Sequence, residues 1–419
     1  ENKQNIPVSF AALGWHLTKG FNREDTMALF NMRDMLNHAH RHGYAIAAFD
    51  LVSLDFLEAI IKAAESCQAP VILSLAESHF DYFDFELAMA ATEAAAKRTW
   101  VPVAIHLDHG ASLQSAVAAI RLGCNGVMVD ASTFPLTENI ARTKSVTDMA
   151  HACGVPVEGE LGYVAGVEGE DAEKHPGELV YTSPEEAVRY VEATGVDFLA
   201  VSIGTVHGRM RGEPQLDFDR LQRIDQSLGI PLVIHGGTGL SDKQFRKLIE
   251  CGVSKINYFT ALADAAADQI RGNLSAAQSQ GGYTALLKGI QLPMQAEMER
   301  CIRLWGSDKR AGELLEACQA WRPVDHMIIY NVAGDSDAQA MIADGRAVLA
   351  AIPGVREVFA GEAVKDDAGY RYSWNVRFCH PDVIDSYRDH PDHVEFANKR
   401  FRPVAADRIS IDFQEIPTR

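Results

Sequence analysis

The chain has 419 residues, of which 47% are hydrophobic and 23% are charged, and its formal net charge at pH 7 is −18. A chain of this length and hydrophobicity can bury a large core, so we expect two domains or one barrel with an appended module. The negative charge argues against nucleic acid and against an anionic membrane surface as partners, although helix N-termini and a few local cations can still hold a phosphate.

The N-terminal region and the cysteines indicate where in the cell the protein is expected. A signal peptide is not expected, because the mildly apolar stretch over 8–17 is preceded by Lys3 alone and no cleavage-type sequence follows it. Residues 1–26 are interpreted as an N-terminal extension, since a plausible helix begins only at Met27. No apolar run approaches the roughly 20 residues that a membrane helix requires. Seven cysteines without a Cys-x-x-Cys pair are typical of reduced thiols, so a cytoplasmic location is expected.

A first helix is predicted over 27–40, and from residue 44 onward short β-rich runs alternate with segments whose apolar residues have helical spacing. Several runs are apolar throughout, as expected for strands that are covered on both faces. The predicted strands are 44–50, 70–77, 101–109, 126–132, 156–162, 198–204, 231–237 and 255–260. The predicted helices are 53–66, 85–97, 112–122, 138–153, 183–194, 218–228, 242–251 and 261–277.

Eight such units over about 220 residues predict an α/β fold, a (β/α)8 TIM barrel, with a doubly wound open sheet as the alternative. Ser112, Ser183 and Ser241 are predicted N-caps of their helices. Residues 283–318 have helical patterns and are expected to extend the barrel domain, which is placed at 27–320. That extension is expected to cover the barrel or to contact a partner subunit.

The composition changes near Trp321-Arg-Pro323. After this point the pattern is β–α–β–β–α–β, over 326–332, 338–351, 355–362, 370–378, 381–390 and 409–416. This order predicts a small α+β domain at 322–419 that is distinct from the barrel.

Three histidines, His109, His207 and His235, stand at the ends of apolar runs that are predicted to be barrel strands. The carboxyl ends of the strands form one mouth in a (β/α)8 barrel, so these distant residues can meet there. Three imidazoles with one open position are the usual composition of a catalytic zinc site. One histidine at a strand end is more often structural, but three together favour a metal site.

Asp108 immediately precedes His109, and on a regular strand the two side chains would point to opposite faces. They can share a site only if the chain leaves regular strand geometry at this point. Asp108 is then a candidate acid/base beside the metal. The alternative is that Asp108 orients a histidine by a hydrogen bond.

Glycines follow two of the histidines, in His207-Gly-Arg-Met-Arg211 and His235-Gly-Gly-Thr-Gly239. Glycine lets backbone N–H groups approach an anion closely, and barrels commonly hold a phosphate in the loops after strands seven and eight. The polar stretch over 163–183 contains Glu168 and is too long for an ordinary connection. It is interpreted either as a mobile lid that carries a carboxylate into the site or as a solvated surface loop.

Four motifs, Leu107-Asp-His-Gly110, Val157-Glu-Gly-Glu-Leu-Gly162, Gly204-Thr-Val-His-Gly208 and His235-Gly-Gly-Thr-Gly239, together resemble the class II, zinc-dependent fructose-bisphosphate and tagatose-bisphosphate aldolases. The resemblance runs from about residue 28 to 306. It implies a lyase of carbohydrate metabolism that reversibly cleaves a ketose (bis)phosphate to dihydroxyacetone phosphate and an aldehyde. Fructose 1,6-bisphosphate or a related ketose phosphate is the expected substrate. The implied cofactors are one catalytic Zn²⁺, with room for a second divalent ion, and a monovalent cation, Na⁺ or K⁺.

The resemblance also implies roles for individual residues. Asp108 is implied as the acid/base at the C4 hydroxyl, and Glu168 as the mobile-loop carboxylate that moves the proton at C3. The implied metal-binding residues are His109, His207, His235, Asp130 and Glu160. The residues expected to bind the substrate are Asp50, Ser53, Gly208, Arg211, Gly236, Gly237, Thr238, Asn257 and Thr260.

Two departures from the family pattern bear on the substrate. The first strand ends in Ala48-Phe-Asp50, where asparagine is common, and the added negative charge should disfavour a phosphate there. Either Asp50 contacts a hydroxyl or the substrate differs. Arg211 stands where a lysine is common, which keeps the positive charge and adds a bidentate fork.

The alternatives to this activity use different chemistry. They are an aldolase for another ketose 1-phosphate or for a non-phosphorylated aldehyde partner, a barrel metallohydrolase with a zinc-bound hydroxide, and a barrel without activity whose tail binds a partner. A Schiff-base aldolase would need a buried lysine at a strand end. Lys255 is expected at the beginning of the eighth strand, which is the wrong end.

The tail contains His326-Met-Ile-Ile-Tyr330, Ile352-Pro-Gly-Val355 and Tyr387-Arg-Asp-His-Pro-Asp-His393. These segments resemble the stress-responsive A/B barrel (Dabb) domains, which are ferredoxin-like modules that pair into dimeric barrels. The resemblance implies a homo-oligomer, a dimer or tetramer, to whose assembly the C-terminal domain contributes. A second pocket that uses His326 or His393 is the alternative.

Overall fold

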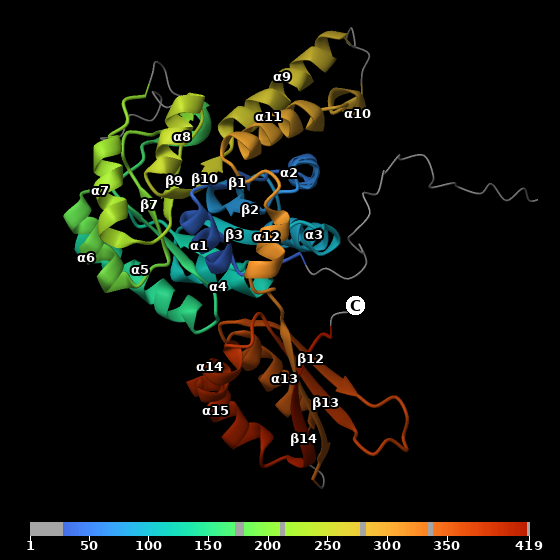
Figure 1. Cartoon of the computed structure of the whole chain (residues 1–419). Helices are drawn as coiled ribbons and strands as arrows, with labels where there is room; N and C mark the ends of the chain where they lie inside the picture. Colours follow the sequence, from blue (N-terminus) through green and yellow to red (C-terminus); the bar gives the residue numbers. More distant parts are fainter. Residues whose placement is uncertain (1–27, 172–179, 210–213, 277–281, 334–337, 417–419) are drawn as a thin grey trace, which may run out of the picture.

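The computed structural model describes residues 28–171, 180–209, 214–276, 282–333 and 338–416. Eight parallel strands form a closed barrel surrounded by helices, and a four-stranded antiparallel sheet lies below it in Figure 1. The prediction of a (β/α)8 barrel followed by a small ferredoxin-like α+β domain is confirmed. No helix in the described ranges is long and apolar enough to cross a membrane.

All eight predicted barrel strands are present, in the order β1-β10-β9-β7-β5-β4-β3-β2 around the barrel. Several are shorter than their apolar runs, because apolar residues such as Val101 and Ile203 extend the pattern while being buried in loops. The strands are β1 (Ile46–Asp50), β2 (Val71–Ala76), β3 (Val103–Gly110), β4 (Gly126–Val129), β5 (Val157–Leu161), β7 (Phe198–Val201), β9 (Leu232–Ile234) and β10 (Val253–Tyr258).

The helices around the barrel begin at short polar side chains. Ser112, Ser183 and Ser241 are N-caps as predicted, since each hydroxyl accepts the backbone N–H three residues along. The surrounding helices are α2 (Leu54–Cys67), α3 (Phe85–Arg98), α4 (Leu113–Leu122), α5 (Leu136–His151), α6 (Pro184–Thr194), α7 (Phe218–Leu228), α8 (Asp242–Glu250) and α9 (Thr260–Ala276).

The amino-terminal end of the barrel is closed by helix α1 (Met32–His42). Met32 and Met35 belong to one buried cluster with inward-facing strand residues such as Ile46 and Ile72. The helix begins five residues later than predicted at residue 27. The reason is that Asn31 caps it, while Leu29 and Phe30 form isolated β-bridges to Val103 and Ala320.

The predicted helical extension forms α10 (Tyr283–Leu286), α11 (Gln291–Leu304) and α12 (Ala311–Ala317). Helices α9 and α11 lie side by side at the upper right of Figure 1. Met294, Met298 and Ile302 of α11 are buried in the outer core of the barrel, whereas Leu314 of α12 joins the cluster around α1.

The C-terminal sheet has the order β12-β13-β11-β14, with all neighbours antiparallel. The second predicted helix, over 381–390, corresponds to α14, and a further short helix that was not predicted begins at Pro391. The elements are β11 (Val324–Val332), α13 (Ala338–Ala350), β12 (Val355–Glu362), β13 (Tyr372–Phe378), α14 (Val383–Asp389), α15 (Pro391–Phe396), the π-helix η3 (Ala397–Phe401) and β14 (Ala405–Gln414).

The C-terminal domain contacts the barrel at the end opposite the carboxyl ends of its strands. Arg356 of β12 binds Glu93 of α3 through two hydrogen bonds of 2.8 and 3.0 Å, and it donates a third, of 3.2 Å, to the Leu122 carbonyl at the end of α4. Ser386 of α14 donates to the Ala152 carbonyl, 2.9 Å away, just after α5. The described part of the C-terminal domain therefore does not contact the mouth formed by the carboxyl ends of the strands through these bonds.

Candidate metal centre and active site

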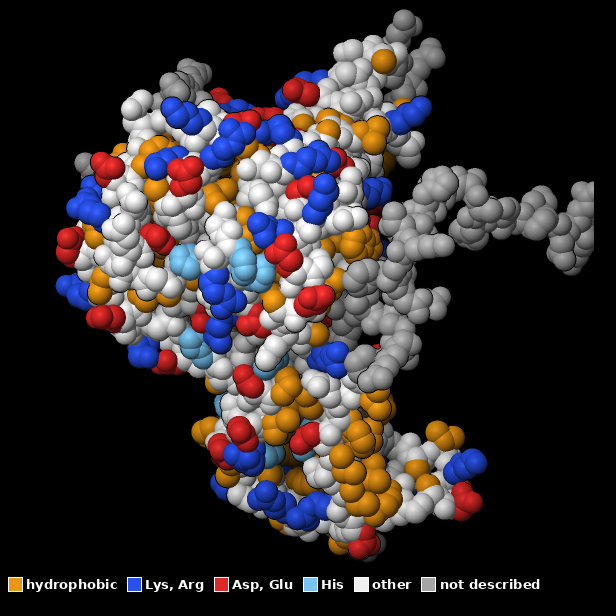
Figure 2. Space-filling view, in the orientation of Figure 1, with side chains coloured by type: hydrophobic (Ala, Val, Ile, Leu, Met, Phe, Trp, Pro, Cys, Tyr) orange, Lys and Arg blue, Asp and Glu red, His pale blue; other side chains and the backbone are white. Residues whose placement is uncertain are grey.

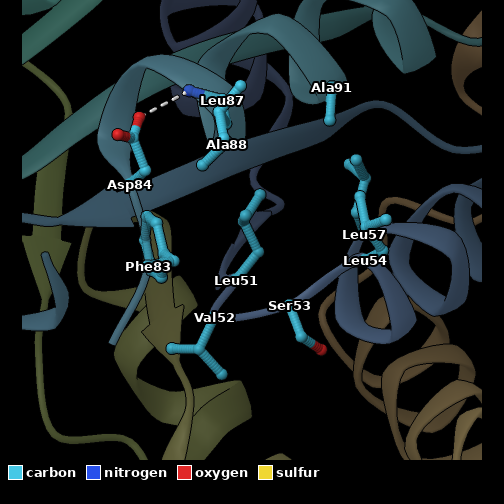
Figure 3. Close-up of a pocket in the computed structure, with 10 residues that line it drawn as sticks. All are labelled: Leu51, Val52, Ser53, Leu54, Leu57, Phe83, Asp84, Leu87, Ala88 and Ala91. Atoms are coloured by element: carbon cyan, nitrogen blue, oxygen red, sulfur yellow. Dashed lines mark hydrogen bonds between the residues drawn. The ribbon is translucent and has the colours of Figure 1, made fainter. Parts of the chain in front are cut away.

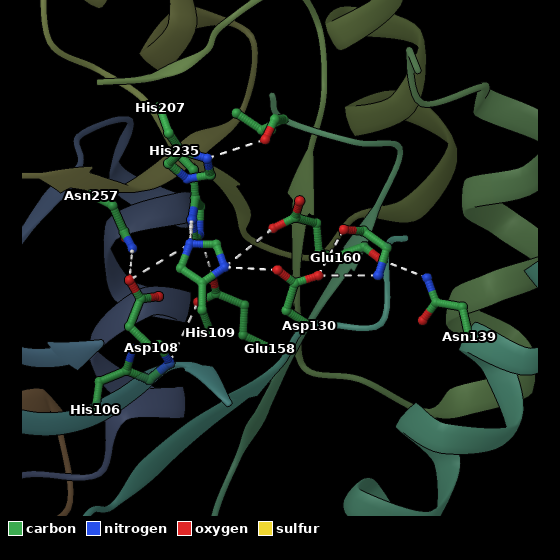
Figure 4. Close-up of polar contacts among 12 residues, drawn as sticks. His106, Asp108, His109, Asp130, Asn139, Glu158, Glu160, His207, His235 and Asn257 are labelled. Atoms are coloured by element: carbon green, nitrogen blue, oxygen red, sulfur yellow. Dashed lines mark hydrogen bonds and ion pairs between the residues drawn. The ribbon is translucent and has the colours of Figure 1, made fainter. Parts of the chain in front are cut away.

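The three predicted histidines come together at the mouth of the barrel (Figure 4). The ring centroids of His109 and His235 are 4.6 Å apart, those of His109 and His207 are 5.0 Å apart, and those of His207 and His235 are 5.8 Å apart. One ring nitrogen from each can be chosen so that all three lie within 4.8 Å of one another. Residues separated by more than 120 positions thus form one cluster.

His109 reaches this cluster through an unusual backbone conformation. Its φ angle is 47°, and the pairing of β3 with β4 shifts register between Leu107 and Gly110. A left-handed residue breaks the alternation of side chains along a strand. Asp108 and His109 can therefore both face the mouth, which is the departure from strand geometry that a shared site requires.

His207 is held by the loop that follows β5 and not by a barrel strand. It lies six residues beyond the end of β7, in the short strand β8 (His207–Arg209), which pairs with β6 (Gly166–Asp171). The backbone N–H of His207 donates to the Ala165 carbonyl, 2.7 Å away, and its Nδ1 lies 3.2 Å from the Val164 carbonyl oxygen. The prediction that His207 closes a barrel strand is wrong, because Gly204 has a φ of 114° and the chain turns there.

His235 follows β9 and bonds to a buried ion pair inside the barrel. Its Nε2 lies 3.0 Å from Oε1 of Glu158, and the same carboxylate binds Nζ of Lys255 at 2.8 to 3.1 Å. His106 approaches the other side of this carboxylate at 3.7 Å. Burial lowers the pKa values of His106 and His235 well below the usual range, which favours neutral imidazoles.

Asp130 and Glu160 lie on the other side of His109. Oδ2 of Asp130 is 2.9 Å from Nδ1 of His109, and Oε2 of Glu160 is 4.0 Å from the same atom. Burial and the negative charge of Asp130 raise the pKa of Glu160 well above its usual value. Burial alone would lower the pKa of His109, but the neighbouring carboxylates raise it well above its usual value.

Asp108 is 1% exposed and accepts a hydrogen bond of 2.9 Å from the side-chain amide of Asn257. Burial alone would raise the pKa of Asp108, but the charge of the neighbouring His109 lowers it to about 2. Its carboxylate is therefore ionised at neutral pH. Asp108 lies close enough to the histidine cluster to exchange a proton with a molecule bound there.

The donor set fits a divalent metal ion. When Nδ1 of His109 donates to Asp130, Nδ1 of His207 to Val164 and Nε2 of His235 to Glu158, each ring keeps one acceptor nitrogen. Nε2 of His109 and Nδ1 of His235 then face each other at 2.8 Å, a distance that a proton on one of them bridges as a hydrogen bond and that a bound cation would bridge in its place. Such outer hydrogen bonds are typical of metal-ligating histidines.

Backbone geometry explains why glycine occupies positions of the predicted anion site. Gly208 and Gly236 have φ angles of 85° and 68°, and a Cβ on Gly236 would lie 2.2 Å from the Val206 carbonyl oxygen. Thr238 and Thr260 lie close to each other. Oγ1 of Thr238, two residues after Gly236, accepts the backbone N–H of Ala261, the residue after Thr260, at 3.3 Å. Thr260 begins α9 and does not belong to β10 as predicted.

The remaining predicted residues are placed as follows. Asp50 ends β1 and is 1% exposed, and Gly237 lies close to Asn257 of β10. Ser53 is exposed and its hydroxyl caps α2, at 3.5 Å from the Phe56 N–H, so the structure shows a helix-capping contact for it. Arg211 and the side chain of Glu168 lie outside the described part of the chain.

Sequence reasoning did not assign roles to Glu158, Lys255 or His106. Glu158 and Glu160 alternate with Gly159 on β5 and are both buried, so the spacing of two places them on the same inward face. Lys255 is the third residue of β10 and is fully buried, whereas it was predicted to begin that strand. A charged residue in the middle of an apolar strand is the signal that could have revealed this pair.

Comparison with known proteins agrees with this geometry. The family model of class-II fructose-bisphosphate aldolase matches residues 30–310, and that of the stress responsive A/B barrel domain matches residues 324–415. A probable fructose-bisphosphate aldolase from Bacillus subtilis (strain 168) is 42% identical over 253 residues, which are 60% of this chain and 88% of that protein.

Two solved structures are similar over the barrel. The YdjI aldolase of Escherichia coli K12 is 34% identical with a TM-score of 0.59, and the match covers 68% of this chain and 99% of that one. A putative fructose-1,6-biphosphate aldolase from Coccidioides immitis is 31% identical with a TM-score of 0.62, covering 68% and 98%. The protein is an aldolase that belongs to the class II fructose-bisphosphate aldolase family and carries a C-terminal Dabb domain.

Proposed function

We propose that this aldolase reversibly cleaves a ketose phosphate to dihydroxyacetone phosphate and an aldehyde, with His109, His207 and His235 as the ligands of a catalytic zinc ion. The observation that carries the proposal is the convergence of three acceptor nitrogens next to the buried, ionised Asp108. Two similar proteins are described as probable or putative fructose-bisphosphate aldolases, which supports the same substrate class.

A zinc ion bound there would act as a Lewis acid toward the negative charge that develops as a carbon–carbon bond breaks. The residues of the chain supply the proton transfers. In the cleavage direction, Asp108 accepts the proton of the C4 hydroxyl, the C3–C4 bond breaks, and its electron pair remains on the dihydroxyacetone phosphate half. We assign the return of a proton to C3 to Glu168, on the strand that pairs with the His207 segment.

We also propose binding roles, for Arg211 on the family resemblance alone because it lies outside the described residues. Asn257 orients Asp108 through its amide, and the backbone N–H groups of Gly208, Gly236 and Gly237 are proposed to bind the phosphate together with Thr238, Thr260 and Arg211. A monovalent cation, Na⁺ or K⁺, is proposed beside this phosphate. Asp130 and Glu160 are proposed to hold a second divalent ion, because their oxygens and Nδ1 of His109 form a separate group of closely spaced donors.

The test of the proposed activity is condensation. The purified full chain is incubated with dihydroxyacetone phosphate and a panel of aldehydes, before and after EDTA treatment and after addition of Zn²⁺. We expect aldol product that EDTA abolishes, that Zn²⁺ restores, and that borohydride does not affect. Hydrolysis of phosphate esters without condensation would indicate a metallohydrolase, and product that survives chelation or is trapped by borohydride would refute the metal mechanism.

The division into an extension at 1–26, a barrel domain at 27–320 and a Dabb-like domain at 322–419 is retained as a proposal. We also propose that the C-terminal domain contributes to a homo-oligomer. Its sheet is covered by helices on one face, and apolar side chains gather on the other, as Figure 2 shows for the lower domain. These exposed residues are Met327, Phe359, Ile409, Ile411 and Phe413.

We propose a cytoplasmic location for the enzyme. All seven cysteines lie in the described part of the chain and none forms a disulfide there. Free buried thiols of this kind are expected in a reducing compartment.

A further inference from the structure

We infer that the ion pair between Arg209 and Asp264 positions His207, so that both residues of the pair control zinc binding without touching the metal. This role rests on the proposed zinc site, in which His207 is a ligand. Three features support it: the place of the His207 segment outside the barrel sheet, the anchoring of the helix that carries Asp264, and the geometry of the pair.

The segment that carries His207 lies outside the barrel sheet. Strand β8 pairs in parallel with β6, and these two strands form a sheet of their own. A sheet of only two strands is at best marginally stable in water by itself. Contacts from this small sheet to the rest of the barrel domain must therefore hold His207 in place for a metal ion.

Backbone contacts fix His207 mainly within its own small sheet. Its N–H donates to the Ala165 carbonyl at 2.7 Å, and its Nδ1 lies 3.2 Å from the Val164 carbonyl oxygen. Both carbonyls belong to the chain that leads into β6. Gly236 packs on the Val206 carbonyl, so that a Cβ on this glycine would lie 2.2 Å from the oxygen. Packing of this kind sets a closest approach, whereas a directional bond to a rigid element also sets an orientation.

Arg209, two residues after His207, makes such a bond. Its Nε donates to Oδ2 of Asp264 at 2.8 Å, and its Nη2 donates to Oδ1 of the same carboxylate. Its Nη1 lies 3.5 Å from Oδ1 of Asp171, at the end of β6. A bidentate pair of guanidinium and carboxylate fixes orientation as well as distance. Arg209 thus connects both strands of the small sheet to Asp264.

Asp264 belongs to a helix that is fixed to the barrel. Helix α9 begins two residues after the end of β10, and its Leu262 and Ala266 are buried in the outer core. Thr260, the first residue of α9, lies one turn before Asp264 on the same face of the helix. The pair therefore joins the segment of a proposed metal ligand to a segment that is proposed to bind the phosphate.

Apolar side chains connect the segments on the opposite side of the barrel, where β1 and β2 lie. The loop after β1 and the beginnings of α2 and α3 enclose a pocket that is lined by Leu51, Val52, Leu54, Leu57, Phe83 and Leu87, among others (Figure 3). Among the described lining residues Asp84 alone is charged, and its Oδ1 caps α3 by accepting the Leu87 N–H at 3.0 Å. Asparagine caps helices as well as aspartate does. Asp84→Asn is therefore a control for the loss of a negative charge near the mouth.

The opposite charges of Arg209 and Asp264 separate positioning from electrostatics. If the pair acted on zinc only through its electric field, loss of the Arg209 cation would strengthen zinc binding and loss of the Asp264 anion would weaken it. Loss of a positioning contact weakens zinc binding in both cases. His207 then occupies its binding position for a smaller fraction of the time, and the affinity falls by that fraction.

The experiment measures the dissociation constant of Zn²⁺ for the purified full chain by competition with a chelator of known affinity. The variants are Arg209→Met, Asp264→Asn and the double variant that combines them. We expect each single variant to weaken zinc binding by about tenfold or more, as loss of an outer contact of a metal ligand does. The double variant should lie within about twofold of the weaker single variant, because both changes remove the same contact.

Turnover and stability give two further readouts. With zinc kept at a saturating concentration, kcat of the condensation should still fall by about tenfold in both single variants, since a misplaced ligand shifts the bound substrate relative to the reacting groups. The unfolding midpoint of the metal-free protein should stay close to that of the wild type. The side chains of the pair are 40% and 35% exposed, and exposed pairs contribute little to stability.

The second control is Asp268→Asn, one turn further along α9, where the carboxylate of Asp268 binds Arg271 at 2.6 Å. Neither Asp268→Asn nor Asp84→Asn should weaken zinc binding as Asp264→Asn does. A comparable loss in either control would show a general effect of charge and would overturn the positioning role.

Stronger zinc binding by Arg209→Met, or wild-type zinc binding by both single variants, would likewise overturn the positioning role while the proposed metal site stands. Losses that add up in the double variant would show that the two residues do not act through one contact. A wild-type chain that binds no zinc would refute the proposed metal site and this inference with it.

Discussion

Nζ of Lys255 lies 2.8 Å from Oε2 of Glu158, and both side chains are fully buried beneath the histidine cluster. The other oxygen of Glu158 accepts from Nε2 of His235, so the ion pair fixes the tautomer of a proposed metal ligand. A charge at this depth is tolerated only because its partner is present.

Lys255→Met should leave an uncompensated buried carboxylate. We expect the free energy of unfolding to fall by about 3–5 kcal/mol, and the affinity for zinc to fall by about 10–100-fold because His235 loses its fixed orientation. Denaturant unfolding of the metal-free protein and titration with Zn²⁺ measure the two effects. Lys62→Met is the control, since its exposed pair with Glu58 should be worth only about 0–1 kcal/mol.

The structure shows which parts of this network the sequence could indicate. The eight strands and the helices between them were predictable because apolar runs and helical spacing alternate regularly. The pair Glu158–Lys255 was not, because an apolar pattern does not reveal which polar residues of two distant strands, β5 and β10, meet inside a closed barrel. Only the three-dimensional closure brings them within hydrogen-bonding distance.

The position of His207 shows a second limit of prediction from the sequence. Its run from Phe198 appeared to be one long strand, but the structure ends β7 at Val201 and carries His207 on a separate two-stranded sheet. The positive φ of Gly204 and the pairing with Ala165 decide this path. Neither can be derived from the alternation of apolar residues, although the glycine itself was a visible signal.

His207→Ala should remove one of the three proposed zinc ligands while leaving the barrel folded. We expect bound zinc, measured by elemental analysis after dialysis, to fall well below one equivalent, and aldol turnover to fall on the order of 10³-fold or more. His40→Ala, at the opposite end of the barrel, serves as the control and should retain full metal content. A His207 variant with undiminished zinc would remove this residue from the ligand set.

Asp108→Ala tests proton transfer separately from metal binding. Its carboxylate contacts Asn257 and lies 3.9 Å from Nε2 of His109, and no hydrogen bond to it holds a histidine. We therefore expect zinc content to be retained and turnover to fall by about 10²–10⁴-fold, the usual contribution of general acid–base catalysis. Parallel loss of zinc and activity would instead support the alternative in which Asp108 orients a ligand.

The contact between the domains predicts a pH dependence of stability. Burial alone would raise the pKa of Glu93, but its hydrogen bonds with Arg356 lower it to about 2. Because the folded-state pKa is below the unfolded value, the pair stabilises the protein above about pH 4.5, and this contribution is lost as the pH falls toward 2. The shift sets an upper limit of about 3 kcal/mol.

The measurement compares the free energy of unfolding of the wild type and Glu93→Gln between pH 7 and pH 2.5. The wild type should be more stable at pH 7, and the difference should shrink as the pH falls. Because both proteins contain the other carboxylates that titrate in this range, the difference in free energy reports the contribution of Glu93. A difference that stays constant with pH would show that the charge of Glu93 does not stabilise the domain contact.

The exposed face of the C-terminal sheet gives a prediction about assembly. Ile411 of β14 is in register with Met327 of β11, and Met327 with Asn375 of β13, which pairs with Phe359 of β12. This row crosses the whole sheet on the face away from the helices, and its apolar members are 39–53% exposed. Contiguous apolar surface of this kind marks interaction sites.

Ile411→Asp places a charge at the β14 end of this row, and burial of that charge in an interface without a partner is costly. We expect the mass in solution, measured by light scattering at several protein concentrations, to shift toward the monomer while zinc content is retained. Val364→Asp is the matched control, because Val364 is fully exposed in the β12–β13 loop and lies outside the row. If Ile411→Asp leaves the mass unchanged, or if both variants reduce it equally, the sheet face is not the surface through which the copies associate.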